Sequence, residues 1–310
     1  MKKTIITILL LFIVAKPFAQ CIPAYGFESK KIQLDSTLVN YVEAGKGKAL
    51  VLIHGLGGNA SHWKRNMEQL SGDYRCIAID LPGYGNSDPV NRTEAATQLD
   101  FYAETVAAVL KKLSIPTAVV MGHSMGGQVA MILALKHPLL VEKLVLIAPA
   151  GLETFTDAEA NLLMTYATAD FYENQDNATI LKSYQSNFFS MPEQAQQLIQ
   201  ERIALKQCPG FKGYCRQIPM GIKGMLYRPV KDRLKELTQP VLVLFGEQDG
   251  LIPNKLLHPS LTVKDVAGVA KQIPGATIQL IPGAGHLLQY EKPEAVNDAA
   301  IKFLKNTKPL

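Results

Sequence analysis

The sequence has few cysteines, little net charge and no internal repeat, and each of these features argues against a class of protein. The four cysteines stand at no metal-ligand spacing from a histidine, so we expect no zinc site. The net charge is +5, but three lysines lie in the first twenty residues, which contain no acid, so the rest carries only +2. Such a charge gives no reason to expect nucleic acid or an anionic membrane surface as a partner.

Long apolar runs are also missing, apart from one at the N-terminus. Lys2 and Lys3 precede an apolar stretch over residues 4–15 that only Thr7 interrupts. A membrane-spanning helix needs about 20 apolar residues, whereas a signal peptide has a shorter apolar region behind a basic end. We therefore predict a signal peptide over residues 1–20 and an exported mature chain, periplasmic or secreted, without a transmembrane segment. A buried N-terminal helix or an uncleaved anchor is the alternative.

The expected cleavage site follows Ala19 or Gln20. Cys21 would then lie near the new N-terminus, where lipidation would make a lipoprotein. Gln20 argues against this, because the residue before a lipidated cysteine is normally small. Export also affects the other cysteines, because an oxidising compartment favours disulfides. Cys208 and Cys215 bracket a short segment with Gly and Pro, and we expect a bridge between them.

Short apolar runs alternate with helical patterns along most of the chain. Strands are predicted over residues 30–34, 38–43, 49–54, 75–80, 118–122, 141–148, 240–246 and 277–282, and helices over 61–70, 97–113, 125–137 and 293–304. Strands that are apolar along their whole length and separated by helices form a parallel sheet covered on both faces. The sequence therefore predicts an α/β fold with a doubly wound, mostly parallel sheet.

The alternation stops between residues 151 and 235. This stretch has helical patches and many methionines and aromatic residues, but no apolar strand. A helical insertion between two strands lies over the carboxyl ends of the strands, where folds of this kind bind ligands. We therefore expect a core made of residues 21–150 and 236–310, and a helical cap, or lid, over residues 151–235. The oligomeric state is left open.

The segment Gly122–Gly127, GHSMGG, contains the pattern Gly-x-Ser-x-Gly between a predicted strand and a predicted helix. In this context the pattern forms a sharp turn that exposes the serine hydroxyl. Glycines flank the serine because a side chain there would collide with the neighbouring strand and helix. The helix N-terminus also directs free backbone N–H groups towards the serine. Ser124 is therefore the candidate nucleophile.

A serine hydroxyl needs a base to remove its proton, and the base needs a carboxylate to orient it. His286 follows the last predicted strand in a glycine-containing loop and is the candidate base. Asp249 follows the strand over 240–246 and is the candidate acid, with Glu247 as the fallback. The strand over 141–148 has no acid close behind it, which removes the other common location.

A tetrahedral intermediate needs hydrogen-bond donors for its oxyanion. The amide of Met125, directly after the candidate nucleophile, is the first expected donor. The second is expected from the turn His54–Gly58, HGLGG, and we assign it to the amide of Leu56, with Gly57 as the near alternative.

The chain resembles the α/β-hydrolase superfamily, in the branch with HGLGG, DLPGYGNSD, GHSMGG, a Gly-x-x-Asp acid and a GAGH histidine. The resemblance covers about residues 39–149 and 240–304. It implies a serine hydrolase with the nucleophile, acid, base and oxyanion donors assigned above. The chemistry of such an enzyme requires no metal or cofactor. The expected cap matches no pattern of the family, and substrate choice is expected to depend on it.

Carboxylic-ester hydrolysis is the activity that we expect from this superfamily member. Dehalogenases and epoxide hydrolases of similar pattern have aspartate where Ser124 stands, so the serine argues against both activities. The methionines and aromatic residues of the cap suggest a small-molecule substrate with an apolar acyl or aryl group. A carbon–carbon bond hydrolase, an amide hydrolase or an acyltransferase with the same triad remains open. So does a function of another class, a ligand-binding protein on a hydrolase scaffold.

Overall fold

The structure, a computed structural model, describes residues 25–35, 37–90 and 98–307. The predicted signal peptide and Cys21 therefore lie outside the described residues. Within these ranges, eight strands form a sheet in the order β1-β2-β4-β3-β5-β6-β7-β8. The strands are β1 (Glu28–Leu34), β2 (Thr37–Ala44), β3 (Lys48–Ile53), β4 (Tyr74–Ile79), β5 (Ala118–His123), β6 (Val141–Ile147), β7 (Val241–Gly246) and β8 (Thr277–Ile281).

The sheet is parallel except at one edge. β1 pairs antiparallel with β2, β2 pairs antiparallel with β4, and the remaining pairs are parallel. The strands β5 and β7 are buried along their whole length, as expected for strands covered by helices on both faces. The predicted α/β fold with a mostly parallel sheet is thereby confirmed.

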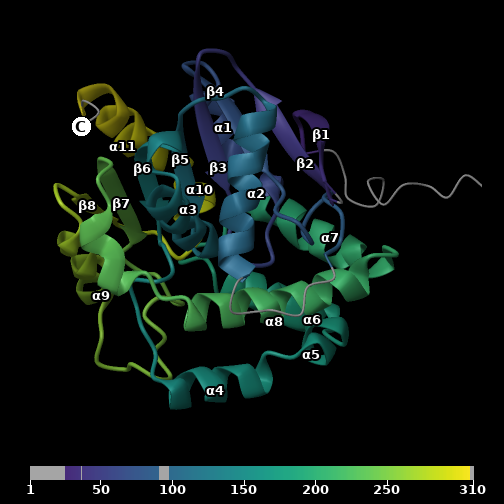
Figure 1. The fold of residues 1–310 in the computed structure, drawn as a ribbon. Helices are drawn as coiled ribbons and strands as arrows, with labels where there is room; N and C mark the ends of the chain where they lie inside the picture. Colours follow the sequence, from purple (N-terminus) through teal and green to yellow (C-terminus); the bar gives the residue numbers. More distant parts are fainter. Residues whose placement is uncertain (1–24, 36, 91–97, 308–310) are drawn as a thin grey trace, which may run out of the picture.

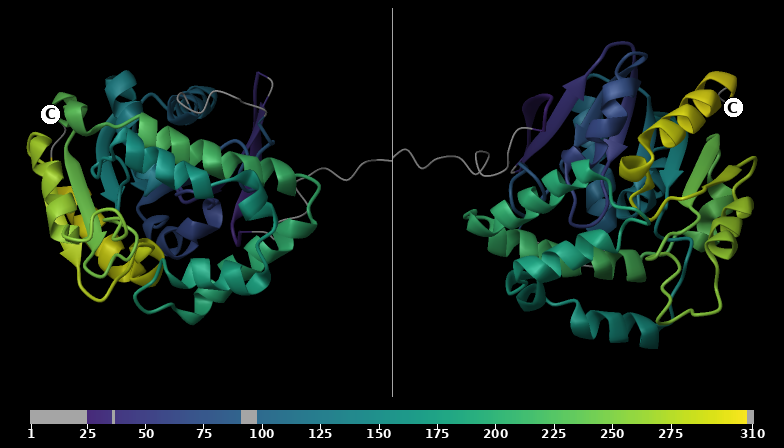
Figure 2. Two further views of the ribbon diagram at one scale, coloured as in Figure 1. Left: turned by 90° about the horizontal axis from the view of Figure 1, so that it is seen from below. Right: turned by 180° about the vertical axis from the view of Figure 1, so that it is seen from behind.

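Helices cover both faces of this sheet. On one face α2 (Gln98–Lys112) packs against α3 (Met125–Lys136) (Figure 1). On the other face α1 (Lys64–Leu70) packs against α11 (Pro293–Asn306), as the view from behind shows (Figure 2). Short elements complete the core: η2 (Ala60–Trp63), η4 (Pro138–Leu140), η7 (Lys231–Glu236), α9 (Val263–Val269), η8 (Ala270–Gln272) and α10 (Leu288–Glu291).

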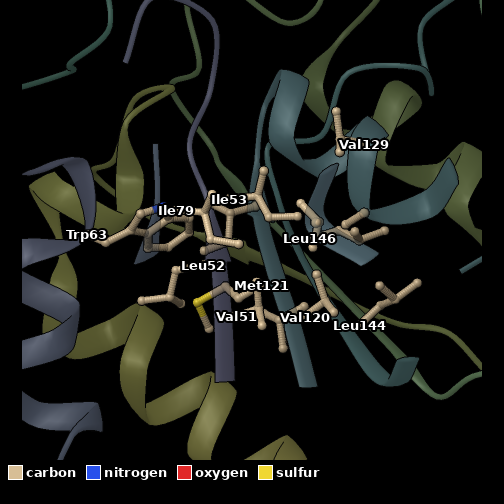
Figure 3. Close-up of a cluster of buried hydrophobic side chains, with 14 of the residues drawn as sticks. Val51, Leu52, Ile53, Trp63, Ile79, Val120, Met121, Val129, Leu144 and Leu146 are labelled. Atoms are coloured by element: carbon tan, nitrogen blue, oxygen red, sulfur yellow. The ribbon is translucent and has the colours of Figure 1, made fainter. Parts of the chain in front are cut away.

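The apolar strands explain why this arrangement is stable. Side chains of β3, β5 and β6 gather in one buried cluster, together with Trp63 of η2 and Val129 of α3 (Figure 3). Trp63 and Val129 are fully buried. Burial of such side chains contributes roughly 1.5–3 kcal/mol each for a Val, Leu or Ile. This cluster holds the strands in register, and so fixes where each strand ends.

Apart from η7, the helices between β6 and β7 lie in the part of the chain, residues 151–235, for which we predict a cap. They are α4 (Asp157–Tyr166), α5 (Ala169–Glu173), α6 (Asn177–Gln185), η5 (Glu193–Ala195), α7 (Gln196–Ala204), η6 (Leu205–Gln207) and α8 (Phe211–Tyr227). Hydroxyl and carboxylate side chains cap the first three: Thr156 precedes α4, Thr168 precedes α5 and Asp176 precedes α6. Figure 1 shows these helices at the end of the sheet where the parallel strands finish. We refer to them as the cap.

The expected bridge between Cys208 and Cys215 was wrong. Cys215 is a buried free thiol, and the Cys208 thiol donates to the backbone oxygen of Ala204 at 3.7 Å. The segment expected to be a loop is helical from Phe211, so the helix fixes the backbone that a bridge would have to bend. Burial raises the pKa of Cys215 to about 11, which keeps the group a thiol. In the described part of the chain, no helix has the length and apolar character to cross a membrane.

Candidate active site

Ser124 occupies the sharp turn between β5 and α3. Its backbone has φ 53° and ψ −118°, a conformation that an L-residue adopts only under strain. The surrounding chain holds this conformation: the Ser124 amide donates to the Ile147 oxygen at 2.9 Å, and the Ser124 oxygen accepts from the Ala150 amide at 3.0 Å. The turn thus follows the predicted pattern, and Ser124 lines a cavity under the cap.

Asp249 and His286 lie together at the ends of β7 and β8. The Oδ2 atom of Asp249 is 2.8 Å from Nδ1 of His286, and both residues are buried. The other carboxylate oxygen, Oδ1, accepts from the amides of Leu251 and Ile252 at 2.8 and 2.9 Å. These contacts orient the carboxylate towards Nδ1–H, which leaves Nε2 of His286 as the acceptor. His286 lines the same cavity as Ser124, whereas Glu247 is exposed.

The expected oxyanion donors lie on two turns beside Ser124. Leu56 and Gly57 line the cavity, and the turn that contains them is closed by a hydrogen bond from the Gly58 amide to the Gly55 oxygen at 3.1 Å. Met125 is the first residue of α3, where backbone N–H groups have no partner inside the helix. The two segments that the sequence selected therefore lie at one site.

Three other histidines are buried nearby. His54 has its Nδ1 atom 2.7 Å from the Gly55 oxygen and accepts from the Leu81 amide at Nε2, so it is a neutral structural group. His123 packs its ring 4.8 Å from that of His286 and places Nε2 3.0 Å from the His286 oxygen. Burial lowers the pKa of His54 to about 4 and of His62 to about 3.

The cavity has a volume of about 440 Å³, within the range of small-molecule sites. One wall is apolar and consists mainly of α8 side chains, Ile218, Ile222, Met225 and Leu226. The described residues offer no group of three or more His, Cys, Asp or Glu side chains suited to a metal ion. The site can therefore hold an organic molecule of moderate size against the candidate nucleophile.

Arg202 of α7 is a cavity residue that sequence reasoning missed. It is buried, and no described residue forms an ion pair with it. Nη2 contacts the Tyr172 oxygen and Gln175 Oε1, both at 3.4 Å, while Nη1 has no hydrogen-bond partner in the described part of the chain. Its guanidinium lies over the rings of Phe211 and Tyr214, 5.2 and 5.0 Å from their centres, but no carboxylate among the described residues balances its charge. No local motif marks this arginine, because the cap has no recognisable pattern.

A second missed group lies at the edge of the cavity, between the cap and the loop after Asp249. Nδ1 of His258 is 2.5 Å from Glu153 Oε1, and Nε2 is 3.3 Å from Glu159 Oε1. Glu153 lines the cavity and also accepts from the Asn254 amide at 2.9 Å. His258 and Glu153 are 105 residues apart in the sequence, so no local signal could have paired them.

Comparisons with known proteins agree with this architecture. A family model described as "alpha/beta hydrolase fold" matches residues 48–293. The chain is 32% identical to the dihydrolipoyllysine-residue acetyltransferase component of the acetoin cleaving system of Pseudomonas putida, over 91% of the chain and 70% of the relative. It is 28% identical to a 2-hydroxy-6-oxononadienedioate/2-hydroxy-6-oxononatrienedioate hydrolase of Burkholderia vietnamiensis, over 86% and 91%. A probable hydrolytic enzyme from Pseudomonas aeruginosa PAO1 superposes with a TM-score of 0.79 at 25% identity, over 91% and 95%.

Proposed function

The chain belongs to the alpha/beta hydrolase fold family, and from this premise we propose that it is a serine hydrolase that cleaves a carboxylic ester through an acyl-enzyme on Ser124. The observation that carries the proposal is the 2.8 Å contact between Asp249 and His286 at a cavity that Ser124 and His286 both line. An imidazole oriented in this way activates a serine hydroxyl, which is a weak nucleophile by itself.

The proposed reaction has two halves. Nε2 of His286 takes the hydroxyl proton while Oγ of Ser124 attacks the ester carbonyl carbon, and the amides of Leu56 and Met125 stabilise the oxyanion. The C–O bond to the alcohol then breaks, and the alcohol leaves with the proton from His286. Water attacks the acyl group in the same way, so the products are one acid and one alcohol and Ser124 is regenerated.

Ester cleavage needs only groups that the site contains. An alcohol leaves once His286 returns a proton to it. Carbon–carbon cleavage needs in addition a substrate able to stabilise a leaving carbanion and a group that protonates that carbon. The amine of an amide is a poorer leaving group than the alcohol of an ester. These requirements make ester hydrolysis the first choice among the activities that share this triad.

The cavity also points to the kind of ester. The apolar wall formed by Ile218, Ile222 and Met225 suits a hydrocarbon acyl or aryl group. Arg202 adds a feature that the sequence did not suggest, because a buried guanidinium that lines the cavity, and has no ion-pair partner among the described residues, suits a carboxylate on the substrate. We therefore propose an ester that has an apolar part and a negatively charged end.

Carbon–carbon bond hydrolysis of an acidic oxo compound is the second candidate. The relative from Burkholderia vietnamiensis is named for the hydrolysis of a 2-hydroxy-6-oxo dioate, and a carboxylate of such a compound would suit Arg202 equally well. The acetyltransferase component from Pseudomonas putida keeps acyl transfer to an acceptor other than water open.

The test compares p-nitrophenyl hexanoate with the mono-p-nitrophenyl ester of adipate, which has the same chain length and one added carboxylate. We expect the mature protein to cleave both, and Ser124→Ala to lose at least about 10³-fold in kcat. Arg202→Gln should lower kcat/KM for the adipate ester more than for the hexanoate ester. Lys212→Gln is the matched control: it also removes one positive charge, but Lys212 pairs with Glu173 on the surface.

Other outcomes redirect the proposal. Cleavage of a 2-hydroxy-6-oxo dienoate, dependent on Ser124, without turnover of either ester would favour the second candidate. Turnover that appears only when an alcohol or thiol acceptor is added would favour a transferase. Tight ligand binding without any turnover would favour a binding protein on a hydrolase scaffold.

We also propose that the chain is exported, from the basic and apolar character of residues 1–20. Expression of the full chain in a bacterial host, followed by fractionation and N-terminal sequencing, tests this. The expected product is found outside the cytoplasm and begins at Gln20 or Cys21. A chain that retains Met1 in the membrane fraction would show an anchor instead, and a lipid on Cys21 would show a lipoprotein.

A further inference from the structure

Helix α8 of the cap touches the turn that contains the expected oxyanion donor. The hydroxyl of Tyr214 donates to the backbone oxygen of Gly57 at 2.9 Å. Gly57 directly follows Leu56 and has a φ of +70°. The contact joins residues 157 positions apart and fixes a peptide plane inside the turn.

The same helix also packs on both expected donors. A Cβ carbon built on Gly221 would lie 2.7 Å from Cδ1 of Leu56 and 3.1 Å from Sδ of Met125. Only glycine allows α8 to approach these two side chains so closely. The helix therefore packs on the side chains of both residues whose amides are the expected oxyanion donors.

Tyr214 is itself held in place. Its ring lies 5.9 Å from that of Tyr84, edge to face, and the guanidinium of Arg202 lies 5.0 Å above it. One turn further along α8, the Gln217 oxygen accepts from the Tyr84 hydroxyl at 3.2 Å, and Gln217 Nε2 donates to the Val90 oxygen at 2.8 Å. These contacts join α8 to core loops and restrict the position of the Tyr214 hydroxyl.

The turn needs such support. It contains three glycines, which are free to adopt many backbone conformations, and its internal closure is the bond from Gly58 to Gly55. An oxyanion donor is effective only when it is aligned before the reaction, so that no reorganisation is required. The Gly57 oxygen and the Gly58 N–H share one peptide plane, and the Gly55 oxygen and the Leu56 N–H share another. The bond from Gly58 to Gly55 joins these planes, so a rotation of the first would misalign the Leu56 amide.

We propose that Tyr214 is a positioning residue of the oxyanion hole: through the Gly57 oxygen, its hydroxyl sets the orientation of the Leu56 amide. The inference rests on the proposed serine-hydrolase function. It assigns α8 to the catalytic framework, in addition to its role as a cavity wall.

Tyr214→Phe removes only the hydroxyl and tests the proposal. We expect kcat and kcat/KM for the ester to fall together by about 10-fold with KM unchanged, because the lost alignment matters only in the transition state. The shape of the pH profile should not change, since the contact of Asp249 with His286 is intact. Tyr227→Phe is the matched control, because Tyr227 lies on the same helix and its hydroxyl donates to Asn161 of α4 at 2.8 Å.

A second measurement separates this inference from the proposed function. A fluorophosphonate labels an activated serine: the Oγ–P bond forms, the P–F bond breaks and the hydroxyl proton passes to His286. Wild-type protein that is not labelled at Ser124 would overturn the serine-hydrolase proposal. Labelling of the wild type with an equal rate for Tyr214→Phe would overturn the positioning role alone.

Two further outcomes decide the remaining cases. A higher KM with kcat unchanged would show that Tyr214 binds substrate instead, since it also lines the cavity. If Tyr214→Phe fails to fold, Tyr214→Met is the second variant, because methionine fills much of the space of the ring and has no group that can donate to the Gly57 oxygen. A lower labelling rate in folded Tyr214→Met supports the proposal, and an unchanged rate contradicts it.

Discussion

Gly122 and Gly126 approach each other so closely that a Cβ carbon on Gly122 would lie 2.3 Å from the oxygen of Gly126. Gly126 is equally confined, since its own Cβ would lie 2.2 Å from the oxygen of Ile53. The backbones of β5, α3 and β3 thus meet at the turn that contains Ser124, and any side chain at either glycine separates them.

Gly126→Ala should therefore damage both stability and activity. The added methyl meets backbone, which cannot move aside as a flexible side chain can, and we expect a loss of about 1–3 kcal/mol in the free energy of unfolding. Activity should fall further, because Ser124 shifts with the turn. Gly268→Ala is the control: it lies in α9 with nothing within 4 Å, and should be neutral or stabilising by up to about 1 kcal/mol. Urea unfolding and ester turnover measure both effects.

Asp249→Asn should lower kcat by about 10³- to 10⁴-fold, the size found for this change in the serine-protease triad. The asparagine side chain presents to Nδ1 of His286 either an NH2 group, which cannot accept from Nδ1–H, or a neutral oxygen. The imidazole is then no longer held in the tautomer in which Nε2 acts as the base. Glu247→Gln should leave kcat unchanged, because Glu247 is exposed. Similar losses in the two variants would show that the acid has been misassigned.

Two buried histidines should make the protein less stable as the pH falls below 6.5, while Asp80, whose pKa burial raises to about 6, acts in the opposite direction. Burial lowers the pKa of His54 to about 4 and of His62 to about 3, against an ordinary value of 6.5. Between pH 6.5 and the lowered pKa values, these two imidazoles bind more protons in the unfolded chain than in the folded one. Their contribution to stability is therefore complete above pH 6.5 and is lost as the pH falls. For His54 alone the loss is on the order of 3 kcal/mol by pH 4.

Urea unfolding at pH 7, 6 and 5 measures this dependence. His62→Gln cannot titrate in this range, so its unfolding free energy should fall less steeply with decreasing pH than that of the wild type. Parallel curves for the two proteins would mean that His62 does not contribute.

Glu153→Gln should loosen the loop that begins at Asp249. Its carboxylate accepts from the Asn254 amide and faces one nitrogen of His258, while Glu159 faces the other. We expect the variant to lose about 1.5–3 kcal/mol of unfolding free energy, with a several-fold lower kcat.

Glu159→Gln is the comparison for that change. Glu159 is more exposed, lies 3.3 Å from His258, and belongs to a capping box that accepts glutamine, so its substitution should cost less stability than Glu153→Gln. A larger effect of Glu159→Gln would place the main contact in α4 rather than in the loop that follows Asp249.

The sequence was most informative where chain neighbours decide the structure. Strand bounds such as Ala118–His123 and Val141–Ile147 agree with the predicted ranges to within a residue, because unbroken apolar runs and flanking turn residues are local signals. The same locality explains why Ser124 could be selected: its strand, turn and helix lie within a few residues of one another. Asp249 and His286 follow strands, and parallel strands end at the same edge of a sheet.

The cap shows where such reasoning stops. Its helices could be expected but not placed, since no pattern says which side chain faces the core. The expected Cys208–Cys215 bridge failed because a helix replaced the supposed loop. Arg202 could not be recognised either, because an arginine on a helix is usually solvated, and only packing shows that it is buried.

The sequence by itself determined the α/β core, the strand order along the chain and the candidate triad, because apolar periodicity and turn chemistry act over a few residues. Tertiary structure alone decided that Tyr214 reaches Gly57, that His258 lies between Glu153 and Glu159, and that Arg202 lines the cavity with no ion-pair partner in the described part of the chain. These contacts join segments that are not neighbours along the chain. They exist because the core brings strand ends together and the cap helices pack over them, and no local pattern encodes that packing.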